Sequence, residues 1–308
     1  MNKFAFLLSA FLFFPLHAAE PTSTQGERTL TRADGSTLIY YLLPKQSRQL
    51  LILLQGSDCN SVSHNPKING VFSSVIPDAD LLLVEKYGVN RDLEWQTTSD
   101  REDCPASFVS NDSPDQRVRD IKLVLNQLES RYDSVILLGG SEGAVVAGML
   151  AASEQRIDAV VALNAGGRFF IDDVLYNMQS TMPPQAYNDA SKGFKGFANA
   201  VLSQASMDIT SGIHGFRWWK SMLSTDQLDI YQQIDVPVLY LQAELDINVD
   251  PKKAHAMAEA LNLDKPLFEY QVLAGLDHGL HDVNGADQSE QVVDKIRDWL
   301  RRLDIKTE

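Results

Sequence analysis

The sequence VILLGGSEGAVVAGML, residues 135–150, joins two different patterns around one serine. The residues before Ser141 form a short apolar run typical of a buried strand, and the small residues after it are typical of a helix. A sharp turn between the two needs small residues on both sides because strand and helix nearly collide, and Gly139 and Gly143 supply them. Such a turn leaves the hydroxyl at a helix N-terminus, which favours anions. The segment therefore matches the G-x-S-x-G pattern of a nucleophilic serine.

The rest of the chain repeats the alternation of strand and helix. Two alternating runs flank Asp34-Gly35, which is typical of a hairpin. Further apolar, strand-like runs lie at 49–56, 79–88, 133–140, 157–167, 236–246 and 266–275, and helical patterns lie at 113–132, 142–154, 250–262 and 287–303. Ser113 and Asp250 precede prolines and are expected N-caps. Near-continuous apolar strands predict an α/β fold with a mostly parallel, doubly wound sheet of about eight strands.

Residues 168–233 interrupt this alternation of strand and helix patterns. They show little strand pattern and are rich in Phe, Met, Trp, Asn and Ser, so we expect a helical cap insertion over the C-terminal edge of the sheet. Its aromatic side chains either pack the insertion onto the sheet, which we favour, or line an acyl pocket. These side chains are Phe169, Phe170, Phe216, Trp218 and Trp219. A long loop after the run 79–88 offers Glu85, Arg91, Glu94 and Trp95 as further candidates for substrate contact.

The first 19 residues have the pattern of a secretory signal peptide. Lys3 supplies a positive start, Phe4–Leu16 is apolar, and Ala18 and Ala19 offer small residues for cleavage. The apolar run is shorter than the ~18 residues of a membrane span, and no later run reaches that length. We therefore expect an exported protein, periplasmic or secreted, whose mature chain begins near residue 20 and has no membrane span.

The charge of the chain limits its possible binding partners, and its cysteine content bears on disulfide formation and metal binding. Asp and Glu number 41 against 27 Lys and Arg, a formal net charge of −14, which argues against nucleic acid or an anionic membrane as partner. Cys59 and Cys104 are the two cysteines, and in an exported protein we expect them to form a disulfide. No CxxC or HxxxH spacing accompanies them, so we expect no metal site.

A serine needs a base, and the base needs a group that orients it. With a turn of this kind, these partners are expected in the order serine, acid, histidine, each after a strand. Asp246 ends the run 236–246, and His278 follows the run 266–275. Ser141, Asp246 and His278 are therefore the predicted catalytic residues.

Neighbouring residues are competing candidates for these roles. Asp250 has the simpler role of a helix cap, and Asp277 adjoins the histidine and is expected to be a loop acid. His281 is the main rival for the base, but His278 comes earlier in the loop after the strand, within reach of the serine.

The order of these motifs resembles the α/β-hydrolase family over residues 27–303. The segments GGS-x-G, P-V-L-x-x-x-x-x-x-D and H-G are similar to those of its serine esterase and prolyl-oligopeptidase-like branches. The resemblance implies that Ser141 is the nucleophile, His278 the general base and Asp246 the orienting acid. It also implies an oxyanion hole made by the backbone N–H groups of Glu142 and Ser57. Many relatives carry His-Gly where this chain has Gln55-Gly56.

These inferences predict an exported serine hydrolase that needs no cofactor. It is expected to cleave an ester or related acyl bond of a small molecule through an acyl-enzyme intermediate. A peptidase of the same fold is the first alternative, with the Glu142 carboxylate attracting the α-amine of a short peptide. A non-catalytic binding protein that keeps the fold is the second. The disulfide is expected to tether the loop that carries Ser57.

Overall fold

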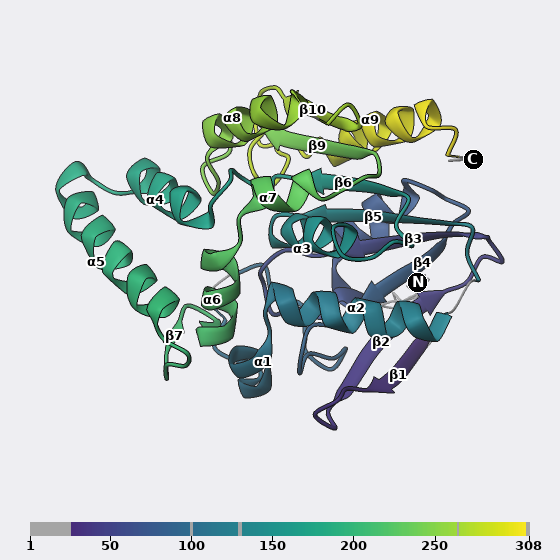
Figure 1. The fold of residues 1–308 in the computed structure, drawn as a ribbon, viewed down its shortest axis with the longest axis horizontal. Coiled ribbons are helices and arrows are strands. Elements are labelled where there is room, and N and C mark those ends of the chain that lie inside the picture. Colours follow the sequence, from purple (N-terminus) through teal and green to yellow (C-terminus); the bar gives the residue numbers. More distant parts are fainter. Residues whose placement is uncertain (1–25, 99–100, 129–130, 264, 306–308) are drawn as a thin grey trace, which may run out of the picture.

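The computed structural model describes residues 26–98, 101–128, 131–263 and 265–305. The expected signal peptide, residues 1–19, lies outside this range. Within it, one eight-stranded sheet forms the centre of the molecule (Figure 1). The α/β class and the number of strands agree with the sequence prediction.

The sheet is mostly parallel. Its strands are β1 (Glu27–Thr31), β2 (Thr37–Leu43), β3 (Gln49–Leu54), β4 (Asp80–Val84), β5 (Ser134–Gly140), β6 (Ala159–Leu163), β9 (Val238–Ala243) and β10 (Phe268–Leu273). Their spatial order is β1-β2-β4-β3-β5-β6-β9-β10, and β2 alone runs in the direction opposite to the other strands. The parallel strands are buried on both faces, which explains their continuous apolar sequences. Their carboxyl ends meet at one edge, where ligands of open α/β sheets bind.

Helices cover both faces of the sheet. The helices α2 (Pro114–Leu128), α3 (Glu142–Ala151), α7 (Gln227–Gln232) and α8 (Pro251–Asn262) pack on one face. The other face is covered by α9 (Ser289–Arg302) and by a chain of short helical turns, η1 (Val62–His64), η2 (Lys67–Val71) and η3 (Phe72–Ser74). The segment η2 is a π-helix, a form often found at functional sites. The expected caps are present, since Ser113 and Asp250 accept hydrogen bonds from the first turns of α2 and α8.

The expected insertion, residues 168–233, contains α4 (Phe170–Thr181), α5 (Pro184–Ser203), α6 (Phe216–Ser224) and α7. It also contains two short strands that the sequence did not predict, β7 (Thr210–Ser211) and β8 (His214–Gly215). Figure 1 shows α4 and α5 projecting beyond the end of the sheet. Phe194, Ala198, Val201 and Leu223 give this part a small apolar core of its own.

The aromatic side chains of the insertion mainly contact one another. Trp218 packs edge-on against Phe170 and Trp219, with ring centroids 5.5 and 4.9 Å apart. Phe216 and Trp219 pack against the core of the insertion. The packing role favoured from the sequence is therefore what the structure shows for Phe170, Phe216, Trp218 and Trp219, whereas the Phe169 side chain is exposed. In the described part of the chain, every helix is too short or too polar to cross a bilayer.

Candidate active site

Ser141 lies in the turn between β5 and α3, as the sequence predicts. Its backbone angles, φ 55° and ψ −126°, are strained for a residue with a side chain. The turn is held by a hydrogen bond of 2.8 Å from the Ser141 N–H to the carbonyl oxygen of Leu163. A Cβ atom at Gly139 would collide with the Gly143 backbone, and one at Gly143 would collide with the Leu54 carbonyl. Both glycines are thus required by close backbone approach.

His278 and Asp246 form a direct pair at the same edge of the sheet. The Nδ1 atom of His278 lies 2.7 Å from an Asp246 carboxylate oxygen, and the Asp246 side chain is fully buried. The Asp246 carboxylate also accepts hydrogen bonds from the backbone N–H groups of Asn248 and Val249. The Gln242 side chain donates a further one, of 3.1 Å. These donors fix the carboxylate, which can then hold the imidazole in one tautomer.

The competing acids and histidine have other partners, although His281 lines the same pocket as Ser141 and His278. Asp250 caps α8. Asp277 and His281 pair with each other at 3.4 Å, and both side chains are substantially exposed. Of the two loop histidines, only His278 contacts a buried carboxylate. The geometry therefore favours His278 as the base, and the catalytic roles of the three residues stay a prediction.

A pocket opens beside Ser141 and His278. It has a volume of about 390 Å³, within the usual range for small-molecule sites. Its wall is mostly apolar and comes from strand ends, η2, η3 and the histidine loop: Leu53, Ile68, Phe72, Leu138, Leu163 and Leu280. Trp95 and Thr97 also line it. The pocket therefore lies on the side of the sheet that η2 and α9 cover.

Trp95 is the one residue of the loop candidates that lines this pocket. The Glu85 carboxylate is buried instead and accepts hydrogen bonds from Tyr41, Ser61 and the Val62 N–H. Arg91 pairs with Glu27, and Glu94 does not line the pocket. Burial is the main cause of the raised pKa of Glu85. Glu85 thus braces the start of η1 rather than contacting the pocket.

The loop after β3 passes directly beside Ser141. A Cβ atom at Gly56 would lie 3.5 Å from the Ser141 Cβ and 4.0 Å from its Oγ. The backbone N–H groups of Ser57 and Glu142, the predicted oxyanion donors, have no hydrogen-bond acceptor among the described residues. Two free N–H groups near a nucleophile have the chemistry of an oxyanion hole. The assignment stays a prediction.

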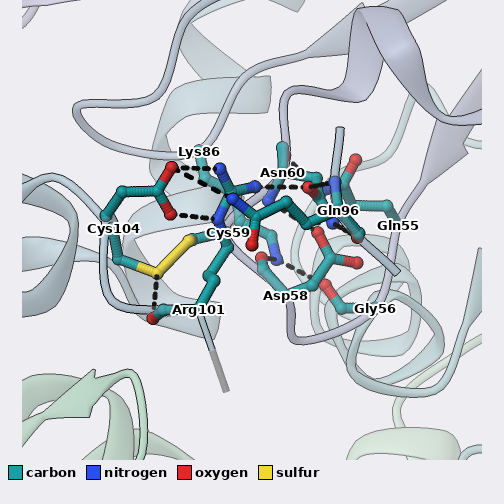
Figure 2. Close-up of a disulfide and its surroundings, with 10 residues drawn as sticks. Gln55, Gly56, Asp58, Cys59, Asn60, Lys86, Gln96, Arg101 and Cys104 are labelled. Carbon is teal, nitrogen blue, oxygen red and sulfur yellow. Dashed lines mark hydrogen bonds and ion pairs between the residues drawn. A yellow bond between two sulfur atoms is a disulfide. The ribbon is translucent and has the colours of Figure 1, made fainter. Parts of the chain in front are cut away.

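The predicted disulfide between Cys59 and Cys104 is present and ties this loop to the segment before α1 (Ala106–Asn111). Figure 2 shows it beside Arg101, Asn60 and Lys86. Asn60 exchanges two hydrogen bonds of 2.9 Å with the backbone of Gln96 and accepts one from Arg101. The loop from Gln55 to Asn60 is therefore fixed on several sides.

The Glu142 carboxylate faces away from the pocket. It is buried and accepts hydrogen bonds of 2.6 Å from Arg117 and from the Trp218 indole. Burial opposes its ionisation, but the Lys86 and Arg117 cations outweigh that effect and hold the pKa of Glu142 below its usual value. The suggestion that this carboxylate attracts a substrate amine is therefore wrong, because it is already paired inside the protein.

Helix α4 of the insertion holds the loop that carries Asp246. Tyr176 donates from its hydroxyl to the Asp246 carbonyl at 3.2 Å, and Asn177 donates to the Ile247 carbonyl at 2.9 Å. One turn earlier, the Asp173 carboxylate accepts from the backbone N–H groups of Asp250 and Gly167. No local pattern predicts these contacts, because α4 lies 70 residues before the loop in the chain.

Among the described residues, no three His, Cys, Asp or Glu side chains are grouped as they are around a bound metal ion. The arrangement instead has a serine at a helix N-terminus, a histidine–carboxylate pair and free backbone N–H groups around one apolar pocket. That set of groups is suited to acyl transfer.

The fold of this chain occurs in many solved structures. An esterase from Pyrococcus furiosus, Pf2001, matches with a TM-score of 0.59 and 15% identity, over 90% of this chain and 91% of that one. Est1E from Butyrivibrio proteoclasticus matches with a TM-score of 0.58 and 15% identity, over 92% and 100%. A proline iminopeptidase from Mycobacterium smegmatis matches with a TM-score of 0.59 and 14% identity, over 91% and 99%.

These similarities establish the fold. The chain has the α/β-hydrolase fold, as its motifs predicted. No protein-family model and no curated protein matches the sequence. Similar structures include both esterases and a peptidase, so the chemistry has to be argued from the site itself.

Proposed function

We propose that this protein is an exported serine hydrolase that cleaves carboxylic esters through an acyl-enzyme. The observation that carries the proposal is the contact of 2.7 Å between His278 and the buried Asp246 carboxylate, because His278 lines the same pocket as Ser141. Export is supported by the N-terminal signal pattern and by the disulfide, since disulfides persist in oxidising compartments.

In this reaction the Ser141 hydroxyl attacks the ester carbonyl carbon while His278 takes its proton. The C=O oxygen becomes an oxyanion, which the N–H groups of Ser57 and Glu142 stabilise. Collapse expels the alcohol, which leaves with the proton from His278. Water, deprotonated by His278, then attacks the acyl carbon; the bond to the serine oxygen breaks, the carboxylic acid is released, and His278 returns the proton to Ser141. Asp246 holds the imidazole and stabilises its charged form.

Esters are favoured over peptides with a free amino group by the character of the pocket. No carboxylate of the described residues lines it, and leucines make up much of its wall. An α-ammonium group would therefore lose its hydration without gaining an ion pair, which is unfavourable. An apolar acyl group, by contrast, gains from transfer out of water.

Covalent labelling tests the chemistry. A fluorophosphonate probe is expected to label the wild-type protein and Ser153→Ala, a control serine at the surface, but not Ser141→Ala. Ser141→Ala is also expected to reduce the hydrolysis of p-nitrophenyl esters by about 10⁴-fold or more without unfolding the protein. Absence of labelling in the folded wild-type protein would instead indicate a binding protein. Cleavage of aminoacyl anilides but not esters would indicate a peptidase.

A further inference from the structure

Lys86 is a buried lysine directly behind the loop that passes Ser141. It follows β4, and only 3% of its surface is exposed. Its ammonium group donates hydrogen bonds to two backbone carbonyls of that loop, those of Gly56 and Asp58 (Figure 2). Lys86 does not line the pocket, whereas Gly56 does. The loop therefore lies between a buried cation and the site of the proposed reaction.

Because the peptide bond is planar, the contact of Lys86 with the Gly56 carbonyl also fixes the direction of the Ser57 N–H. In a planar trans peptide, the C=O of one residue and the N–H of the next point in opposite directions. The described chain has no cis peptide bond. Since the Gly56 carbonyl points toward Lys86, the N–H of Ser57 points away from Lys86. This N–H has no acceptor among the described residues, and the neighbouring Gly56 lies against Ser141.

The surroundings of Lys86 explain how a charge is kept there. Glu142 and Asp112 are buried acids whose charges interact with it, and Arg117 is the second cation of the cluster. Phe108 places its ring 5.8 Å from the ammonium. A buried charge is tolerated when it is paired and hydrogen-bonded in this way. A lysine serving only to neutralise the acids would not need to bind the carbonyls of both Gly56 and Asp58 in one loop.

We infer that Lys86 is a positioning residue for the oxyanion hole: by binding the Gly56 and Asp58 carbonyls, it turns the Ser57 N–H toward the developing oxyanion. Its positive charge also polarises that peptide, which strengthens the N–H as a donor. The inference rests on the proposed hydrolase function and adds a residue that touches neither substrate nor nucleophile.

The test compares two lysine-to-methionine variants. Lys86→Met removes the ammonium and keeps an unbranched, apolar side chain. Lys220→Met is the matched control, because Lys220 also binds backbone carbonyls, those at the end of α5, but lies in the insertion. Both variants are assayed for thermal unfolding, for kcat and KM on p-nitrophenyl esters, and for inhibition by an alkyl trifluoromethyl ketone. That ketone forms a serine adduct whose oxygen occupies the oxyanion hole.

Lys86→Met is expected to lower kcat by about 10- to 100-fold. This reduction is no larger than the one that follows removal of an oxyanion donor itself, because the Ser57 N–H is still present. KM is expected to change little, and affinity for the ketone to fall by the same factor as kcat/KM. Lys220→Met is expected to leave kcat, KM and the affinity for the ketone unchanged. A Lys86→Met protein that is less stable but keeps wild-type kcat and ketone affinity overturns the inference and leaves the hydrolase function standing. An unreactive wild-type protein would overturn the function itself.

A second measurement covers the case in which Lys86→Met does not fold. Serine residues of the wild-type protein are labelled with ¹⁵N, and the Ser57 amide signal is assigned by its loss in Ser57→Ala. Formation of the ketone adduct is expected to shift the Ser57 N–H signal strongly downfield, since a new hydrogen bond to an oxyanion forms. A Ser57 signal that stays in place when the adduct forms overturns the inference without any Lys86 variant.

Discussion

Two loops flank Ser141, and they are fixed by different means. The loop from Gln55 to Asn60 is held from the body of the fold by the Lys86 ammonium and by the Cys59–Cys104 disulfide. The loop from Asp246 to Asp250, here called the acid loop, is held by α4 of the insertion. The groups of α4 that bind it are a hydroxyl, an amide and a carboxylate, and none of them is a cation. One loop thus depends on charge and a covalent bond, and the other depends on hydrogen bonds from an element that projects from the sheet.

This difference indicates what the insertion does. The aromatic side chains of the insertion do not line the pocket. Helix α4 contacts the backbone of the loop that carries Asp246, and Trp218 of α6 contacts Glu142 beside Ser141. Movement of α4 would alter the position of Asp246 and leave the Ser57 peptide in place. Each of the following changes acts on one loop and not on the other.

The largest expected effect concerns Asp173 and is a pH effect. Burial raises the pKa of Asp173 from 3.8 to about 8, and the charges of Asp250 and Asp172 add to the shift. Because the unfolded chain releases this proton near pH 4, the free energy of unfolding falls as pH rises from about 4 to 8. Asp173→Asn keeps an oxygen for the two N–H donors and removes the titration. Denaturant unfolding is expected to show it more stable than wild type by roughly several kcal/mol at pH 9, with little difference near pH 4.

The control for this experiment is Asp172→Asn, on the same helix. Its side chain is about a third exposed, so water can solvate its charge. A wild-type stability curve parallel to that of Asp173→Asn from pH 4 to 9 would contradict the assignment of the pH dependence to Asp173.

The next effect concerns the disulfide. Replacing both cysteines in Cys59→Ala/Cys104→Ala is expected to lower the free energy of unfolding by about 2–4 kcal/mol, since the bridge closes a long loop. The kcat for ester hydrolysis is expected to fall by a smaller factor than in Lys86→Met, because Lys86 still binds the loop. Denaturant unfolding and kcat measure the two effects, and reduction of the wild-type protein gives an independent comparison. Equal stability and equal kcat in the oxidised and double-variant proteins would show that the bridge does not fix the loop.

The smallest effect is expected from the contacts of α4. Tyr176→Phe/Asn177→Ala removes two hydrogen bonds to the acid loop, and each is worth about 1 kcal/mol. The double variant is expected to lose about 10-fold in kcat, whereas its affinity for the ketone is expected to stay unchanged, because the loop from Gln55 to Asn60 is untouched. Thr181→Ala, at the far end of α4, serves as the control. Wild-type kcat in the double variant would show that α4 does not position Asp246.

Much of the fold was predictable from the sequence because its patterns are local. Apolar runs predicted the positions of the strands, and Ser113 and Asp250 predicted where two of the helices begin. The turn at Ser141 was recognisable because only glycine fits beside it. The pairing of Asp246 with His278 followed from their places after parallel strands, whose carboxyl ends share one edge.

Other features had weaker local signs or none. The insertion was predicted as helical, but its two short strands β7 and β8 were not, because each spans only two residues. Lys86 follows Glu85 directly after an apolar strand, and two charges at that place are a local sign of a buried polar cluster. The direction of the Glu142 side chain was predicted wrongly, because its partners Arg117 and Trp218 come from distant helices.

By itself the sequence determined the strand and helix order, the serine at the sharp turn and the acid and histidine that follow, since each depends on near neighbours along the chain. Only the tertiary structure decided where the pocket opens, which side chains hold the two flanking loops and which carboxylates are already paired. Those properties depend on burial and on contacts between residues far apart in sequence, and such contacts leave no periodic pattern in the chain.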